Sequence, residues 1–247
     1  MALRETQSAA PAVSLVAVLA VVGAALAGCS DEGNDSPASF SDGTAAEIRD
    51  AVVADMEKLA SVRLAGTATV EGQPVTLDVQ MDTEGNCVGS IVLKGGRAQL
   101  INTPTESFLR GNGPFWRNSS QTPAQGEAFV RKVGSKWVRM AAGAGGFSSF
   151  CDLDQIVSSV SEESTAVDKG DFGEVGGVGA VSLTKPGSVG GTDTVWVAAD
   201  GRHYILKLET VGGDEPGTFL LTDHDEAVDV HLPDPSEVVD LDSVSTD

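Results

Sequence analysis

The sequence has 247 residues, 41% of them hydrophobic, so we expect one domain with a hydrophobic core and room for tails. Its formal net charge of −20 comes from 36 acidic and 16 basic residues and is spread along the chain rather than blocked. Because a nucleic acid or an anionic bilayer would be bound through a basic patch, and none is evident in the sequence, both kinds of charge-driven binding are disfavoured.

The N-terminus has the pattern of a bacterial lipoprotein signal peptide over residues 1–28. A short polar start precedes an apolar run at 13–27, which is shorter than the roughly 20 residues of a transmembrane helix. The four residues 26–29, LAGC, resemble a lipobox, in which Cys29 is acylated and becomes the new N-terminus. The alternative is a plain signal, or an uncleaved anchor, with a chance cysteine.

Residues 29–43 are predicted to form an acidic flexible tether. The segment SDEGNDSPASFSDG has no base and little apolar surface to bury. As a loose coil it would span on the order of 20 Å. We therefore expect the domain to be held at the outer face of the cell membrane by lipid on Cys29.

A helix is predicted at about 44–60, followed by an antiparallel meander of strands. Thr44 and Glu47 have capping-box spacing, and apolar residues then recur at helical spacing. The pattern changes to alternation of apolar and polar residues, with short turns between the runs. The expected strands are 61–70, 75–82, 87–94, 97–102 and 106–111.

Two further helices and a second meander are predicted after this. Thr122 and Pro123 mark a helix start, and Trp137 lies in a half-buried stretch. A helix is expected within 147–160. The dipeptide Asp200-Gly201 indicates a hairpin. The remaining expected strands are 175–185, 193–200, 203–210, 218–223 and 226–233.

The three cysteines divide into one lipidation site and one pair. With Cys29 acylated, Cys87 and Cys151 remain, and an extracytoplasmic location favours a disulfide between them. There is no CxxC spacing for redox work, and two sulfurs without nearby histidines make a poor zinc site.

No enzyme signature is present, so we expect no catalytic residues and no cofactor. The sequence lacks GxSxG, and its glycine-rich stretches are not followed by GK[ST]. On a strand, Asp223, Asp225, Asp229 and His231 would share one face and could hold a hard metal ion. A solvated face of an acidic protein explains the same pattern, so no metal site is assigned.

The large aromatic residues are concentrated in the middle of the chain. Phe115, Trp116, Trp137, Phe147 and Phe150 lie within 36 residues of one another. They are explained either by packing of helices on the sheet or by an apolar, partly open cavity between the sheet and its helices.

The lipobox, tether, first helix, SVRLAGTATVEGQPVTLDVQMDTEGNCVGSIVL, KWVRM and VWVAADGRHYILKLE together resemble the actinobacterial LppX/LprG-type lipoproteins of the LolA-like group. The resemblance implies an α+β fold, a strongly curved antiparallel sheet (half barrel) with helices covering its concave face, over residues 44–247. It also implies a hydrophobic cleft that holds acylated lipids or lipoproteins. The unusual acidity and glycine content of this chain leave the size and content of such a cleft open.

The resulting hypothesis is a non-catalytic, membrane-tethered carrier or binder of a lipid-like ligand. The alternative is an interaction or sensor module of the envelope, on the same scaffold, with a filled core. The candidate cavity residues are Val62, Leu64, Leu77, Val79, Ile91, Leu93, Trp116, Phe147, Phe150, Leu153 and Trp196.

Overall fold

The structure is a computed structural model that describes residues 39–142, 151–161, 167–188 and 190–244. The chain divides into two units, 1–36 and 37–247, and only the second contains described residues. The predicted signal peptide and Cys29 lie outside the described residues. Among the helices in the described part of the chain, none is both long and apolar enough to cross a bilayer.

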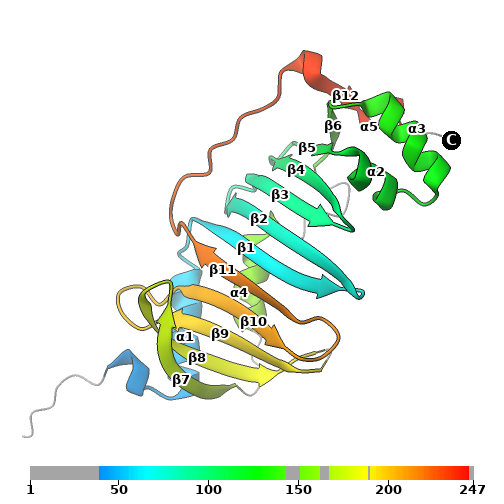
Figure 1. The fold of residues 1–247 in the computed structure, drawn as a ribbon. Coiled ribbons are helices and arrows are strands. Elements are labelled where there is room, and N and C mark those ends of the chain that lie inside the picture. The colour runs from blue at the N-terminus through cyan, green and yellow to red at the C-terminus, as the bar shows by residue number, and fades with distance from the viewer. Residues whose placement is uncertain (1–38, 143–150, 162–166, 189, 245–247) are drawn as a thin grey trace, which may run out of the picture. The chain divides into compact units, whose positions relative to one another are not determined.

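The described unit is built on one curved sheet with two meanders (Figure 1). Alternation of buried and exposed residues gives each strand one face for the core and one for solvent. The first meander consists of β1 (Ser61–Val70), β2 (Gln73–Asp82), β3 (Cys87–Leu93), β4 (Gly96–Asn102), β5 (Glu106–Gly111) and β6 (Trp137–Ala141). These strands match the sequence prediction closely, because alternation and turns are local signals.

The second meander belongs to the same sheet as the first. It consists of β7 (Asp168–Val175), β8 (Val178–Pro186), β9 (Thr192–Ala198), β10 (Ile205–Val211) and β11 (Gly217–Thr222). Its last strand, β11, pairs antiparallel with β1. The strand order is therefore β12-β6-β5-β4-β3-β2-β1-β11-β10-β9-β8-β7, with both meanders in a single sheet.

Helices cover one face of this sheet, which we call the concave face. α1 (Ala45–Met56) begins at the predicted capping box, in which Thr44 accepts from the Glu47 N–H and the Glu47 carboxylate accepts from the Thr44 N–H. α3 (Pro123–Val133) begins as predicted after Thr122, and α4 (Leu153–Ser161) begins inside the predicted range 147–160 and ends one residue beyond it. The two remaining helices are α2 (Gly113–Ser119) and α5 (Leu241–Val244).

The predicted strand 226–233 is wrong. After β11 the chain leaves the sheet and crosses the opposite, convex face near one end of β1 to β5 (Figure 1). It rejoins the sheet as β12 (Val238–Asp240), which pairs parallel with β6 after the short helix η4 (Pro235–Glu237). Residues 226–233 cross the strands instead of running beside one. Their backbone therefore does not pair with a neighbouring strand, although apolar and polar residues alternate as in a strand. We call these residues the strap.

Other differences concern elements with weak local signals. Helix α2 and strand β7 were not predicted as separate elements, and α2 spans only seven residues. The predicted tether end is folded, since Phe40–Asp42 form the helix η1 and the Phe40 ring stacks on His203 at 3.5 Å between centroids. The Asp200-Gly201 hairpin joins β9 to β10 as expected, although through a connection longer than two residues.

Candidate functional site at the concave face

The concave face of the first three strands is continuous and apolar. Val62, Leu64, Leu77, Val79 and Ile91, all predicted as candidate cavity residues, point to this side and are buried in the main core cluster. The pairing registers Leu64 with Val79 and Val62 with Met81, so these side chains stand directly opposite one another across strands.

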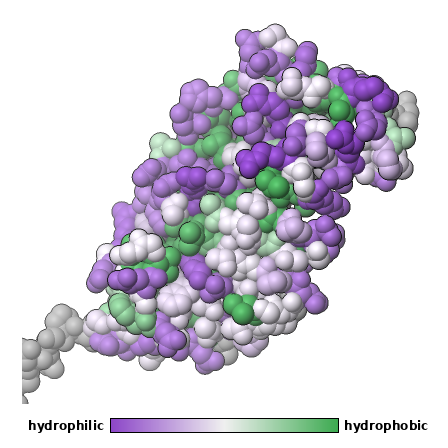
Figure 2. Space-filling model, viewed as in Figure 1, coloured by the Kyte–Doolittle hydropathy of each residue, from purple (hydrophilic) through white to green (hydrophobic). Residues whose placement is uncertain are grey.

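The same apolar face continues onto the second meander. Leu221 on β11, Val197 on β9, and Val181 and Leu183 on β8 belong to the same core cluster. Figure 2, which shows the side facing away from α1 and α4, has mostly hydrophilic side chains with scattered apolar ones. The main apolar core of the described residues therefore lies on the concave side, which is the better match for a hydrophobic ligand.

The remaining candidate cavity residues separate into three groups. Leu93 is half-buried at the concave face, and Trp116 on α2 and Leu153 on α4 are buried in the same core. Trp196 was wrongly placed in the set, because Val195 and Val197 face the core and Trp196 therefore points to the convex face, where the Lys207 ammonium lies 5.9 Å from its ring. Phe147 and Phe150 lie outside the described residues.

One glycine on β4 and one on β5 leave the space in which α2 packs against the sheet. A Cβ atom at Gly96 would lie 2.2 Å from the Phe115 Cα, and one at Gly111 would lie 2.5 Å from the Phe115 ring. The helix is capped by Asn112, whose side chain accepts from the Phe115 N–H. Glycine therefore brings the aromatic pair Phe115 and Trp116 against the sheet itself, and Trp116 also contacts Phe129 of α3 at 4.9 Å between centroids.

A pocket of about 260 Å³ opens between the C-terminal end of α1 and α4. We call it the α1–α4 seam. Its apolar lining comes from Met56, Leu59, Leu153 and Val157, all of which belong to or pack against the core beneath. Its polar rim is formed by Glu57, Thr83, Asp154 and Ser158. The seam is thus an opening with an apolar floor and a hydrophilic edge, the combination that suits an amphipathic ligand.

The disulfide Cys87–Cys151 fixes one side of the seam. It joins the start of β3 to the residues just before α4, with 5.6 Å between the Cα atoms. The predicted pairing is confirmed. Since 64 residues separate the two cysteines, the crosslink contributes about 4 kcal/mol in the chain-entropy account.

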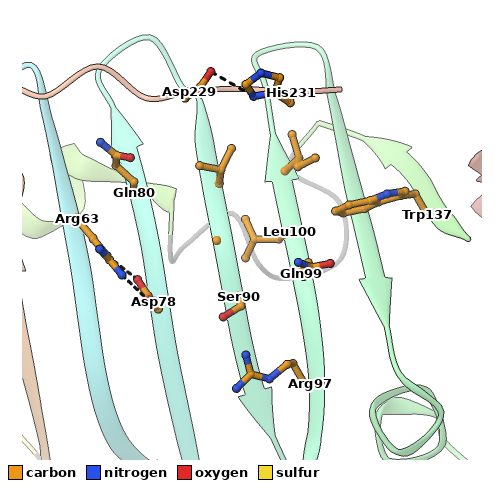
Figure 3. Close-up of a pocket in the computed structure, with 13 residues that line it drawn as sticks. Arg63, Asp78, Gln80, Ser90, Arg97, Gln99, Leu100, Trp137, Asp229 and His231 are labelled. Carbon is orange, nitrogen blue, oxygen red and sulfur yellow. Dashed lines mark hydrogen bonds and ion pairs between the residues drawn. The ribbon is translucent and has the colours of Figure 1, made fainter. Parts of the chain in front are cut away.

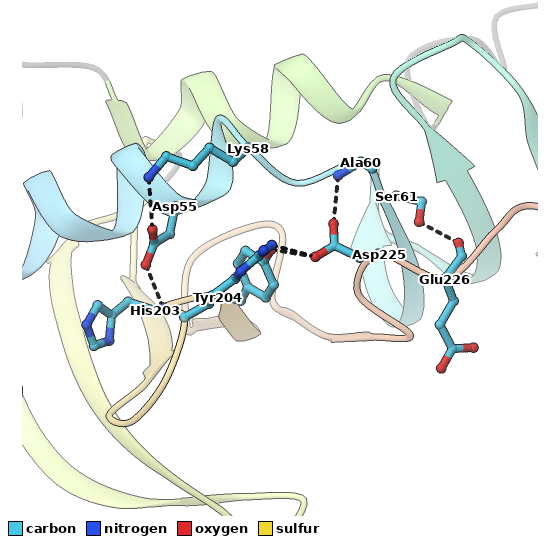
Figure 4. A network of polar contacts seen from close by, with 9 residues as sticks. Asp55, Lys58, Ala60, Ser61, His203, Tyr204, Asp225 and Glu226 are labelled. Atoms are coloured by element: carbon cyan, nitrogen blue, oxygen red, sulfur yellow. Dashed lines mark hydrogen bonds and ion pairs between the residues drawn. The ribbon is translucent and has the colours of Figure 1, made fainter. Parts of the chain in front are cut away.

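A polar network fixes the other side, at the end of α1 (Figure 4). The Asp55 carboxylate accepts from the His203 N–H at 2.9 Å, and this bond holds the pKa of Asp55 below its ordinary value. The Asp225 carboxylate accepts from the Ala60 N–H at 2.9 Å and from the Tyr204 hydroxyl at 2.7 Å, which lowers the pKa of Asp225 as well. α1 is thereby bonded to the β9–β10 connection, and the segment between α1 and β1 is bonded to the residue just before the strap.

The acidic residues that the sequence offers as metal ligands instead form hydrogen bonds or ion pairs with other side chains. Asp225 belongs to the network, Asp223 lies 3.6 Å from Arg63, and Asp229 pairs with His231 on the strap at 3.2 Å. They do not share one face, because the segment is not a strand. In the described ranges, no three potential ligands are placed to hold one metal ion.

Comparison with known proteins identifies the fold. No family model matches the chain, and no curated protein matches it significantly. The lipoprotein LppX of Mycobacterium tuberculosis superposes with a TM-score of 0.51 at 16% identity, covering 76% of this chain and 97% of LppX. LprF from Mycobacterium bovis gives 0.51 at 13% identity, covering 78% and 99%. The expected LppX-type, LolA-like fold is confirmed; at these identities the likeness concerns the fold alone.

Proposed function

We propose that this protein is a membrane-tethered, extracytoplasmic lipoprotein that binds a lipid-like hydrophobic molecule without catalysis. The observation that carries the proposal is the apolar concave face with an opening at the α1–α4 seam. The resemblance in fold to LppX, itself a lipoprotein, supports the same proposal. The lipobox at residues 26–29 supports a lipid anchor on Cys29, which would keep the domain close to its ligand source.

The ligand would enter by separation of α1 and α4. The seam encloses about 260 Å³, which is less than the roughly 300–1,000 Å³ of most small-molecule sites. Besides the burial of their apolar side chains, the helices are attached by the disulfide next to α4 and by the polar network at the end of α1. Movement of α4 against α1 would then enlarge the seam toward the core without breaking the sheet.

The test is binding of a fluorescent fatty-acyl probe to the domain lacking residues 1–38. We expect saturable binding, and we expect Val157→Trp, which adds bulk at the seam, to weaken it by at least tenfold. The matched control is Gln155→Trp on the exposed side of the same helix, which should bind as the wild type does. Absence of probe binding, together with absence of lipid in full-length protein extracted from membranes, would refute the proposal.

The alternative is an interaction or sensor module with a filled core. It is favoured by the tight burial of the concave face, where Val62, Val79 and Ile48 of α1 have no exposed surface. In that case crosslinking in membranes would give one stoichiometric protein partner, and the Val157→Trp variant would not change probe binding because there would be none.

A further inference from the structure

A second pocket lies away from the seam, on the convex face. It is a groove of about 560 Å³ whose floor is formed by β1 to β4 (Figure 3). Trp137 forms one wall, and Asp229 and His231 of the strap form another. Its volume lies within the range of small-molecule sites. This groove is separate from the proposed lipid site, which is on the opposite face of the sheet.

Two pairs of polar side chains in the groove are bonded to one another. The Arg63 guanidinium donates to both oxygens of Asp78, at 2.8 and 2.9 Å. Asp229 lies 3.2 Å from His231. Both carboxylates of the groove therefore have a side-chain partner, and the charge of Asp78 is balanced by Arg63.

Three side chains that line the groove carry hydrogen-bond donors with no partner among the described residues. Ser90 and Arg97 make no side-chain hydrogen bond or ion pair with any other described residue, and both line the groove. The Gln99 amide oxygen accepts two bonds from Arg110, at 3.0 and 2.6 Å, so its NH₂ group is turned away and stays available. Ser90 stands directly opposite Gln99, and Arg97 is two residues from Gln99 on the same strand (Figure 3).

The part of the sequence that contains β4 and β5 is rich in bases. Between residues 94 and 140 the sequence has only two acids, Glu106 and Glu127. Half of its 16 bases fall in this stretch, namely Lys94, Arg97, Arg110, Arg117, Arg131, Lys132, Lys136 and Arg139. Of these bases only Arg97 is among the residues that line the groove, where Arg63, Asp78 and Asp229 are the other charged groups.

We propose that Ser90, Arg97 and Gln99 form a binding site for a phosphate group. Arginine supplies a fork of N–H donors, and the hydroxyl and amide approach from the neighbouring positions of β3 and β4. Donors arriving from several directions suit a tetrahedral oxyanion better than a planar carboxylate. The phosphate can come from a free phosphorylated molecule or from a phospholipid headgroup, which share this chemistry.

The site is tested by NMR titration of the domain with inorganic phosphate and, separately, with monomeric short-chain phosphatidylglycerol at constant ionic strength. We expect saturable shifts of the Ser90 and Gln99 amides. Arg97→Gln should weaken binding at least tenfold and Ser90→Ala several-fold. Arg131→Gln, the same change at an exposed arginine of α3 outside the groove, should change it less than twofold.

The two probes also distinguish the source of the phosphate. Binding of inorganic phosphate supports a free ligand, and binding of the lipid alone supports a headgroup. Equal losses in Arg97→Gln and Arg131→Gln would overturn the proposal in favour of diffuse attraction. So would acetate binding as tightly as phosphate, or the absence of saturable shifts with either probe.

Discussion

At the scale of single residues, the carboxylates of Asp55 and Asp225 are the groups that attach α1 to the rest of the domain. Each accepts a hydrogen bond from a backbone N–H of a distant segment, at His203 and Ala60 respectively. Such bonds stabilise the ionised carboxylate more than the protonated carboxyl group, so they lower the pKa of both groups. Burial raises the pKa of Tyr204, which keeps its hydroxyl protonated as a donor to Asp225.

This arrangement predicts a loss of stability in acid. A carboxyl group with a lowered pKa in the folded state contributes stability above its unfolded pKa of about 4, and that contribution is lost as the pH falls through the folded pKa. Asp225→Asn should lower the free energy of unfolding by about 1 kcal/mol at pH 6, after allowance for solvent screening, and by less at pH 3. Urea unfolding at both pH values measures this.

The matched control is Asp200→Asn, at an exposed position in the β9–β10 connection for which no side-chain contact to the described residues is present. It should leave stability unchanged at both pH values. A deficit in Asp225→Asn that stays the same from pH 6 to pH 3 would mean that the charge of Asp225 does not contribute.

At the scale of elements, α2 depends on glycine in the strands beneath it. The helix has seven residues and is too short to be stable through its own hydrogen bonds. Its stability comes from burial of Phe115 and Trp116 against β4 and β5, which is possible because Gly96 and Gly111 have no side chains. The position of α2 therefore depends on glycine at these two positions of the strands, and the stability of α2 depends on its contact with those strands.

We predict that Gly96→Ala destabilises the domain by about 1–3 kcal/mol, the usual cost of overpacking a core. The new Cβ would lie 2.2 and 2.3 Å from backbone atoms of Phe115, which cannot move without displacing α2. The control is Gly113→Ala, where a Cβ would meet only the flexible end of the Arg117 side chain at 3.3 Å. Urea unfolding followed by tryptophan fluorescence compares them, and equal stabilities would contradict the account.

At the scale of the whole domain, the two meanders are joined by three connections. β1 pairs with β11 inside the sheet, the strap crosses to β12 on the convex face, and the disulfide joins β3 to α4 on the concave side. Val230 of the strap packs against a small cluster of Ile101, Phe108 and Trp137, separate from the main core. These links hold helices that have few hydrogen bonds of their own to the sheet.

Removal of the disulfide should weaken the domain and loosen α4. We expect the Cys87→Ser, Cys151→Ser double variant to lose about 4 kcal/mol, the value for a loop of this length, less if the unfolded chain keeps structure. Urea unfolding measures the loss, and hydrogen exchange should locate the increased opening in α4 rather than α1. An unchanged midpoint relative to the oxidised wild type would show that the crosslink adds no stability.

The sequence alone determined the features that depend on neighbours along the chain. Alternating residues predicted β1 to β5 within a few residues, and the Thr44–Glu47 and Thr122–Pro123 signals located the starts of α1 and α3. Counting cysteines predicted the disulfide. These features rest on local periodicity and capping, so they need no knowledge of distant contacts.

Only the tertiary structure decided the rest. The strap alternates like a strand but has no strand beside it, and Trp196 faces away from the core because its neighbours Val195 and Val197 face it. The free donors Ser90, Arg97 and Gln99 could not be recognised from sequence, since which polar groups remain unpaired depends on every partner that folding brings near them. The pairing of strands and the pairing of polar groups both depend on contacts between residues far apart in the chain. A local sequence pattern therefore cannot predict them.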